Sequence, residues 1–227
     1  IDNIPTVDIP TSGNYWPFAP TSETQMRQEM LFNRTLINSS GTIDKIAFQA
    51  WSTTPQSCTV QNLSIRMAYS SNDTLGPVFE ANRNSPWVEV LNLISYNISL
   101  QARGEWIDID VNNIFNYDNT QNLLVEIRWR GGSGNDIFLF LNYSAAYAGQ
   151  MAIANYSAVT GVVYSNRVYN FQAIFADSAN LTWTASSLNP TLFTASISAG
   201  RNLVITPLPN QNGAGVARLV LHNSNGL

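Results

Sequence analysis

Apolar and polar residues alternate in short runs along most of this chain, and the runs are rich in β-branched and aromatic side chains. In Asn122–Trp129, for example, Glu126 and Arg128 alternate with apolar neighbours, as in an antiparallel strand that buries one face. Almost no segment keeps the 3.6-residue period of an amphipathic helix. The pattern therefore predicts an all-β protein.

Twelve strands are predicted from this pattern. They are Gln25–Ile37, Thr42–Trp51, Thr59–Tyr69, Trp87–Ile94, Trp106–Val111, Asn122–Trp129, Asp136–Asn142, Val168–Phe175, Leu181–Ala185, Ala195–Ser198, Leu203–Pro207 and Ala217–His222. Segments rich in Gly, Asn and Ser, such as Gly131–Asp136, separate the strands and supply residues that tolerate positive φ. Twelve strands in a chain of 227 residues indicate a jelly roll or β-sandwich.

By composition the chain has three parts. Residues 1–12 form an extended N-terminal segment in which Pro5 and Pro10 bracket Thr6–Ile9, so this segment suits the edge of a sheet and not its centre. Residues 13–177 form an aromatic-rich β-sandwich domain. Residues 178–227 form a smaller module rich in Ser, Thr, Asn and Leu, which begins near Asp177–Asn180.

Charged residues make up only 11% of the chain, against about 25% in an average soluble domain. The net charge is −4, and the basic residues are spread singly along the chain. Nucleic-acid binding needs a concentrated basic face, so it is disfavoured. No apolar run approaches the ~18–20 residues of a membrane-spanning helix, and the first residues do not have the pattern of a signal peptide.

The sequon for N-glycosylation, Asn-x-Ser/Thr, occurs eight times, a modest excess over chance for this composition. The acceptor residues are Asn33, Asn38, Asn62, Asn72, Asn97, Asn142, Asn155 and Asn180. The alternative is that Asn-rich turns create sequons by accident. We interpret the excess as the mark of an exported, extracellular protein with covalent N-glycans.

Residues that could support catalysis are scarce. His222 is the only histidine, it falls in a predicted strand, and no G-x-S-x-G motif is present. Cys58 is the only cysteine and is expected to be a small buried apolar residue. One His and one Cys cannot build the usual zinc site. The sequence therefore predicts neither an enzyme nor a bound cofactor.

Asp108 and Asp110 alternate with isoleucines, so both carboxylates point to one face of a strand. With Asn112, Asn113 and Asp118 they are a weak candidate for a calcium site, although the spacing matches no EF-hand loop. A glycosidase-type carboxylate pair is a further alternative. A solvated strand face is the interpretation we favour.

The chain contains six Trp and nine Tyr, which raises the question of carbohydrate binding. Five of the tryptophans lie in strand patterns, where core packing is the usual explanation; they are Trp51, Trp87, Trp106, Trp129 and Trp183. Tyr15 and Trp16, beside Pro17 and Phe18 in a proline-rich segment, are the aromatic residues expected to be exposed.

The stretch Asn180–Leu227 resembles the cadherin-like and immunoglobulin-like repeats that large prokaryotic surface proteins carry in tandem. The matching elements are Leu181–Ala185, Asn189-Pro190, Leu203–Pro207, Asn210–Gly213 and Asn225–Leu227. The resemblance implies a small immunoglobulin-like sandwich on a non-catalytic extracellular protein. His222 stands where the family usually has an acidic residue, which puts a calcium role for that position in doubt.

The first 177 residues are similar to β-sandwich modules of secreted bacterial and archaeal surface proteins. The similarity rests on Thr42–Phe48, Trp87–Val90, Trp106–Ile109, Phe115–Tyr117 and Asn122–Ile127. It too implies an extracellular building block.

Such an immunoglobulin-like sandwich normally closes with a further strand after Asn225-Gly226, so the last strand is expected to be missing here. The incomplete sheet would expose apolar core and unpaired backbone groups. Ile1–Pro10 is a suitable donor strand, with Ile4, Val7 and Ile9 as its apolar side chains. Donated to the next copy, it would make a heterologous contact that propagates as a filament. The alternatives are that Ile1–Pro10 folds onto its own chain, or that the sequence is a fragment of a longer protein.

Two functions follow from these expectations. The first is an extracellular structural subunit, which binds copies of itself by strand exchange in a cell-surface filament or lattice. The second is an adhesin or carbohydrate-binding fragment of a large multidomain surface protein. Neither function requires a cofactor.

Overall fold

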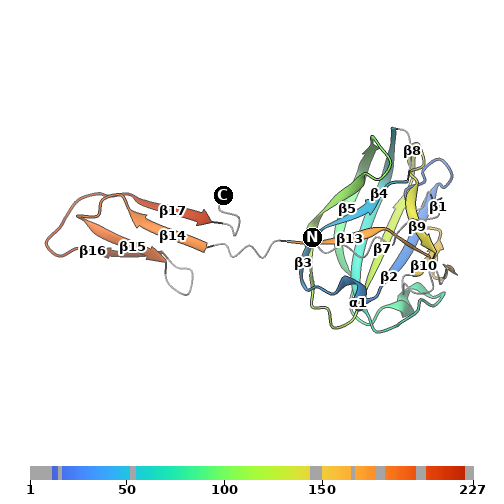
Figure 1. Cartoon of the computed structure of the whole chain (residues 1–227), viewed down its shortest axis with the longest axis horizontal. Coiled ribbons are helices and arrows are strands. Elements are labelled where there is room, and N and C mark those ends of the chain that lie inside the picture. Colours follow the sequence, from blue (N-terminus) through green and yellow to red (C-terminus); the bar gives the residue numbers. More distant parts are fainter. Residues whose placement is uncertain are drawn as a thin grey trace. The chain divides into compact units, whose positions relative to one another are not determined.

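The computed structural model describes residues 12–14, 17–51, 55–143, 150–164, 167–176, 182–197 and 203–222. The chain is nearly all β, as predicted, and it divides into two compact units, Ile1–Ala176 and Asp177–Leu227 (Figure 1). This division lies beside the expected boundary between residues 177 and 178.

The first unit contains thirteen of the described strands and two short helices. The strands are β1 (Ser12–Asn14), β2 (Gln25–Phe32), β3 (Gly41–Gln49), β4 (Gln56–Ser70), β5 (Val88–Leu100), β6 (Trp106–Tyr117), β7 (Asn122–Arg130), β8 (Gly132–Gly134), β9 (Leu139–Tyr143), β10 (Gln150–Ala154), β11 (Val162–Tyr164), β12 (Arg167–Tyr169) and β13 (Phe171–Phe175). The helices are α1 (Arg34–Ile37) and the single 3-10 turn η1 (Phe79–Asn82).

These strands form a β-sandwich. The larger sheet has the order β11-β10-β2-β7-β4-β5, with β8 paired to β4. Two smaller sheets, β13-β3-β6 and β1-β9-β12, are linked by a bridge between Ala50 and Leu139. Across the core, the rings of Phe32 in β2 and Phe171 in β13 stack with centroids 4.2 Å apart. The apolar face of β7, from Leu123 to Trp129, packs into the same core.

The predicted strand Gln25–Ile37 is wrong in its last third, where α1 forms instead. Asn33 precedes the helix, and its side-chain oxygen accepts a hydrogen bond of 2.9 Å from the backbone N–H of Thr35. Asn38 ends the helix in a left-handed conformation with φ 45°. Side-chain capping by Asn therefore overrides the β-branched character of the segment.

Four short strands, β1, β8, β10 and β11, were not predicted, and the predicted Val168–Phe175 is split between β12 and β13 in different sheets. The Gly-rich segment expected only as a turn contains β8, which pairs with Cys58–Val60 of β4. A Cβ atom at Gly132 would lie 2.4 Å from the Thr59 carbonyl oxygen. Glycine at this position therefore allows β8 to approach β4 as a strand.

The alternation of buried residues in β4 changes phase at Asn62. Cys58 and Val60 face the core before this point, whereas Leu63 and Ile65 face it afterwards. Asn62 has φ 51°, a left-handed conformation that is rare inside a strand and that Asn tolerates better than most residues. The side chain of Asn62 is consequently exposed on the outer face of the larger sheet.

The second unit contains β14 (Thr182–Ser187), β15 (Phe193–Ile197), β16 (Leu203–Pro207) and β17 (Ala217–His222). In its described part these strands form two two-stranded sheets, β14-β17 and β15-β16. Among residues 184–197 and 203–220, whose side chains are described, none is buried. The second unit thus differs from the first, which has a large closed core.

Candidate functional site

The second unit exposes aliphatic side chains from several elements. Leu203, Val204 and Ile205 of β16 are between 40% and 44% exposed, and Leu219 of β17 is 46% exposed. An isolated two-stranded sheet is marginally stable in water, and large contiguous apolar patches on soluble proteins usually mark contact sites. The apolar surface of this unit is therefore the first candidate functional site.

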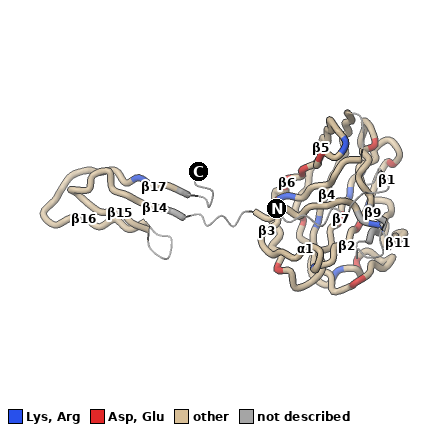
Figure 2. Tube along the Cα trace, in the orientation of Figure 1, with Lys and Arg blue, Asp and Glu red and all other residues tan. Residues whose placement is uncertain are grey.

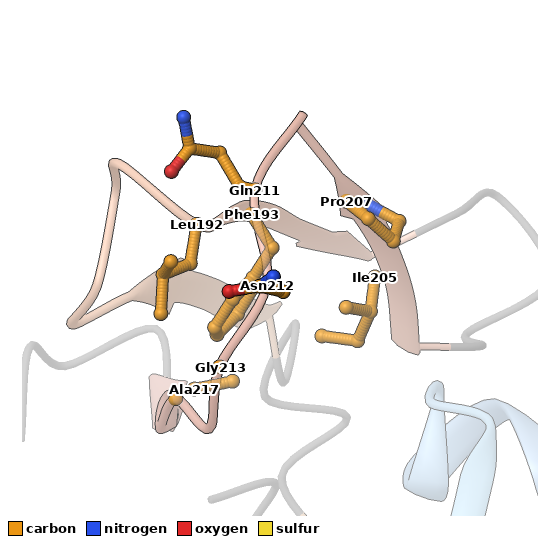
Figure 3. Close-up of a pocket in the computed structure, with 9 residues that line it drawn as sticks. Leu192, Phe193, Ile205, Pro207, Gln211, Asn212, Gly213 and Ala217 are labelled. Atoms are coloured by element: carbon orange, nitrogen blue, oxygen red, sulfur yellow. The ribbon is translucent and has the colours of Figure 1, made fainter. Parts of the chain in front are cut away.

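A hollow of about 350 Å³ lies within this surface (Figure 3). Phe193 and Ile205 line it from β15 and β16, Ala217 lines it from the start of β17, and the loop Gln211–Gly213 forms its rim. The chain is anchored on both sides of this loop: the backbone N–H of Leu208 donates to the Leu192 carbonyl at 2.9 Å, and that of Val216 donates to the side-chain oxygen of Asn189 at 2.8 Å. We call this hollow, together with the side of β16 that carries Ile205 and Pro207, the apolar groove.

The apolar groove lies in a nearly uncharged environment. Figure 2 shows the charged residues concentrated in the first unit, and Arg218 is the one charged residue among residues 182–197 and 203–222. Over the whole of residues 177–227 the sequence has two arginines and one aspartate. The donor segment 1–10 predicted from the sequence carries two aspartates and no basic residue.

The donor residues predicted from the sequence, Ile4, Val7 and Ile9, lie outside the described residues. The structure therefore describes the candidate acceptor surface and not the candidate donor. No feature of the sequence alone pointed to the hollow beside Phe193, because it forms where a turn folds over β15.

A second feature is a buried network of charges on the outer face of the larger sheet. The carboxylate of Glu126 in β7 is fully buried and accepts hydrogen bonds from Arg27 of β2 at 2.7 Å and from Arg66 of β4 at 2.6 Å. Arg128 donates to the same carboxylate at 3.1 Å. Three guanidinium groups thus surround one carboxylate.

Two further carboxyl groups complete the network. Glu29, in β2, is buried beside Glu126, and Asn82 of η1 donates to it at 2.8 Å. Burial, and secondarily the charge of Glu126, raise the pKa of Glu29 to about 8, which favours its protonated form at neutral pH. Although partial burial acts in the opposite direction, hydrogen bonds from Arg83, Trp87 and Arg27 lower the pKa of Glu80.

The expectation that Glu126 lies on a solvent-facing side of its strand is wrong. The segment that connects β4 and β5 covers this face of the sheet, with Leu75 and Phe79 packed on Leu31 and Leu124. Both buried carboxyl groups, Glu29 and Glu126, are fully enclosed, so a substrate cannot reach them. The sequence did contain a signal for this network. In a chain with few charged residues, β2 and β7 each carry an arginine and a glutamate two positions apart.

The candidate calcium residues do not come together. Asp108 and Asp110 share one exposed face of β6, where the ammonium group of Lys45 lies 3.2 Å and 3.3 Å from their carboxylates. Asp118 is eight residues beyond Asp110, about 26 Å along an extended strand, and its carboxylate accepts hydrogen bonds from Thr120. In the described part of the chain no three His, Cys, Asp or Glu side chains are grouped as metal ligands.

Cys58 is buried, as predicted, and burial, followed by the charge of Asp136, raises the pKa of its thiol to about 12. His222 ends β17, and its side chain lies outside the described residues. Phe18, next to the predicted exposed pair Tyr15 and Trp16, is fully buried and packs edge-on against Phe48. Tyr15 and Trp16 lie outside the described residues.

Six of the eight sequon asparagines have described side chains, and none of the six is buried. Asn38, Asn62, Asn97 and Asn155 are exposed, whereas Asn33 and Asn72 are half-buried. The side chains of the other two, Asn142 and Asn180, are not described. Four of the eight sequon asparagines are therefore exposed to solvent, as a glycan acceptor must be.

Comparison of the chain with protein-family models, with curated proteins and with solved structures finds no match. Among the helices in the described ranges, none is long and apolar enough to cross a membrane.

Proposed function

We propose that this protein is an extracellular structural subunit that assembles by strand exchange. Residues 1–10 of one copy add a strand to the second unit of the next copy, and Val7 and Ile9 enter the apolar groove from one face of that strand. Each copy then donates one segment and accepts one, so the contact repeats and produces a filament. The exposed sequon asparagines carry N-glycans on the outside of this filament.

One observation carries the proposal: the second unit has exposed aliphatic residues around a hollow of about 350 Å³, and none of its described side chains is buried. A sheet of two strands gains backbone hydrogen bonds and apolar burial when a third strand is added. Six extended residues span about 20 Å, which matches acceptor strands of five or six residues such as β16 and β17.

The proposal is tested by supplying the donor strand separately. The chain without residues 1–10 should not assemble, and a synthetic peptide with the sequence of residues 1–10 should bind it with a stoichiometry of one to one. A peptide with Val7→Asp and Ile9→Asp should not bind. Sedimentation velocity measures assembly, and isothermal titration measures binding of the peptide.

The acceptor is tested with a pair of neighbouring substitutions in β16. Ile205→Asp places a charge in the apolar groove and should weaken binding of the peptide at least tenfold, since an unpaired charge is costly in an apolar site. Thr206→Asp adds the same charge on the opposite side of the strand and should leave binding unchanged. Assembly of the chain without residues 1–10, or equal effects of the two substitutions, would refute strand exchange.

A further inference from the structure

The outer face of the larger sheet carries a second cavity, of about 250 Å³, that belongs to neither the apolar groove nor the core. Polar side chains from β4, β5 and β7 and from the loop after β10 line it: Asn62, Arg66, Glu89, Asn92, Arg128 and Tyr156. The change of phase at Asn62 turns this side chain outward into the lining, and Ile94 of β5, which also lines the cavity, is 86% exposed.

Several polar groups of the cavity are held in place by hydrogen bonds to side chains beneath it or within its own lining. Glu126 fixes the guanidinium groups of Arg66 and Arg128 from beneath the cavity floor. Glu89 is fixed by Ser64 at 2.8 Å and by Asn92 at 3.0 Å. A site whose side chains are already ordered loses little conformational entropy when a ligand binds.

The composition of the lining selects the class of ligand. Arg66 and Arg128 disfavour a cation, whereas the carboxylate of Glu89 disfavours an anion. Sugar hydroxyl groups both donate and accept hydrogen bonds, so they can pair with the arginines and with Glu89 at once. Ile94, which is 86% exposed, offers apolar surface for the C–H face of a sugar ring, and Tyr156 adds a further aromatic side chain to the lining.

We propose that this cavity binds a saccharide of one or two sugar rings. Its volume lies just below the ~300 Å³ at which pockets for drug-sized ligands begin. The sugar has two possible sources. One is the N-glycan of Asn62, which requires the glycosylation proposed above, and the other is a saccharide that is not attached to the chain. All lining residues belong to the first unit, so the site is independent of strand exchange.

The test is an NMR titration of the full chain produced without glycans, with N-acetylglucosamine and mannose as probes. At least one sugar should shift the amide signals of Asn92, Ile94 and Tyr156. Asn92→Ala should weaken this binding about tenfold, the loss of one good hydrogen bond. Asn112→Ala, an exposed asparagine of β6 outside the cavity, should have no effect.

The chain isolated with its glycans distinguishes the two sources. If the Asn62 glycan fills the cavity, free sugar should produce no shifts in the glycosylated chain until Asn62→Gln removes that glycan. If the sugar comes from outside the chain, the glycosylated chain should bind it as well as the chain without glycans does. The proposal is overturned if neither sugar shifts these signals in the bare chain, if sulfate shifts them as well as sugar does, or if Asn92→Ala and Asn112→Ala have the same effect.

Discussion

At the scale of single residues, the charges of this protein have very different surroundings. Glu126 is fully buried among three arginines, whereas Asp110 has 84% of its side chain exposed beside Lys45. The sequence offers almost the same alternating pattern at both positions. Whether the side of a strand that faces away from the core is buried depends on a segment distant in the sequence. The sequence alone therefore could not show that Glu126 is buried and Asp110 is exposed.

We expect the stability of the first unit to fall as the pH rises from about 5 to 8. Glu29 has an ordinary pKa near 4.5 when unfolded and about 8 when folded. Between these two values the folded state binds a proton that the unfolded state does not, and this proton stabilises the fold. The stabilisation is complete when the pH is below the pKa of the unfolded state, and it is lost as the pH rises through the pKa of the folded state. Denaturant unfolding at a series of pH values measures the slope of the unfolding free energy against pH.

Glu29→Gln should remove most of that slope, because an amide does not titrate, and its oxygen can still accept the hydrogen bond from Asn82. At pH 8 the variant should be more stable than the parent chain, with a difference on the order of a few kcal/mol at most. An unchanged slope in the variant would mean that another group titrates.

Glu126→Gln should destabilise the first unit by about 3 kcal/mol at pH 6, because three arginines lose the carboxylate that neutralises them. The matched control is Asp110→Asn, which removes one carboxylate of an exposed pair and should cost below about 1 kcal/mol. Equal costs in chemical denaturation would show that the buried network contributes no more than a surface pair.

At the scale of elements, strands with alternating residues or an apolar run were predictable, and β1, β8, β10 and β11 were not. β7 follows from the alternation of apolar and charged residues from Val125 to Arg130, and β16 follows from its apolar run Leu203–Ile205. β8 consists of Gly132–Gly134, whose pairing depends on contact with β4 and not on its own side chains. α1 depends on one capping residue, Asn33, so a periodicity argument misses it.

The cap gives a prediction at this scale. Asn33→Ala should cost about 1 kcal/mol of unfolding free energy, whereas Asn33→Asp should be close to neutral because aspartate also caps helices. Both substitutions destroy the sequon at this position, so the comparison is made on the chain produced without glycans. Equal stability of the two variants in denaturant unfolding would show that the cap is not what holds α1.

At the scale of the whole molecule, the two units have opposite properties. The first has a closed core between two layers, and the second has an apolar groove with no buried side chain in its described part. Composition and alternation predicted the sandwich and the four strands of the second unit. They could not predict the groove itself, because its shape depends on the turn that brings Asn212 and Gly213 over Phe193.

The central claim is that one copy completes the second unit of another, and electron microscopy of the native assembly tests it most directly. The account predicts regular filaments in which residues 1–10 of one copy lie as a strand beside β15-β16 or β14-β17 of the next, with Val7 and Ile9 in the apolar groove. Isolated particles, or filaments in which residues 1–10 pack on their own chain, would contradict it.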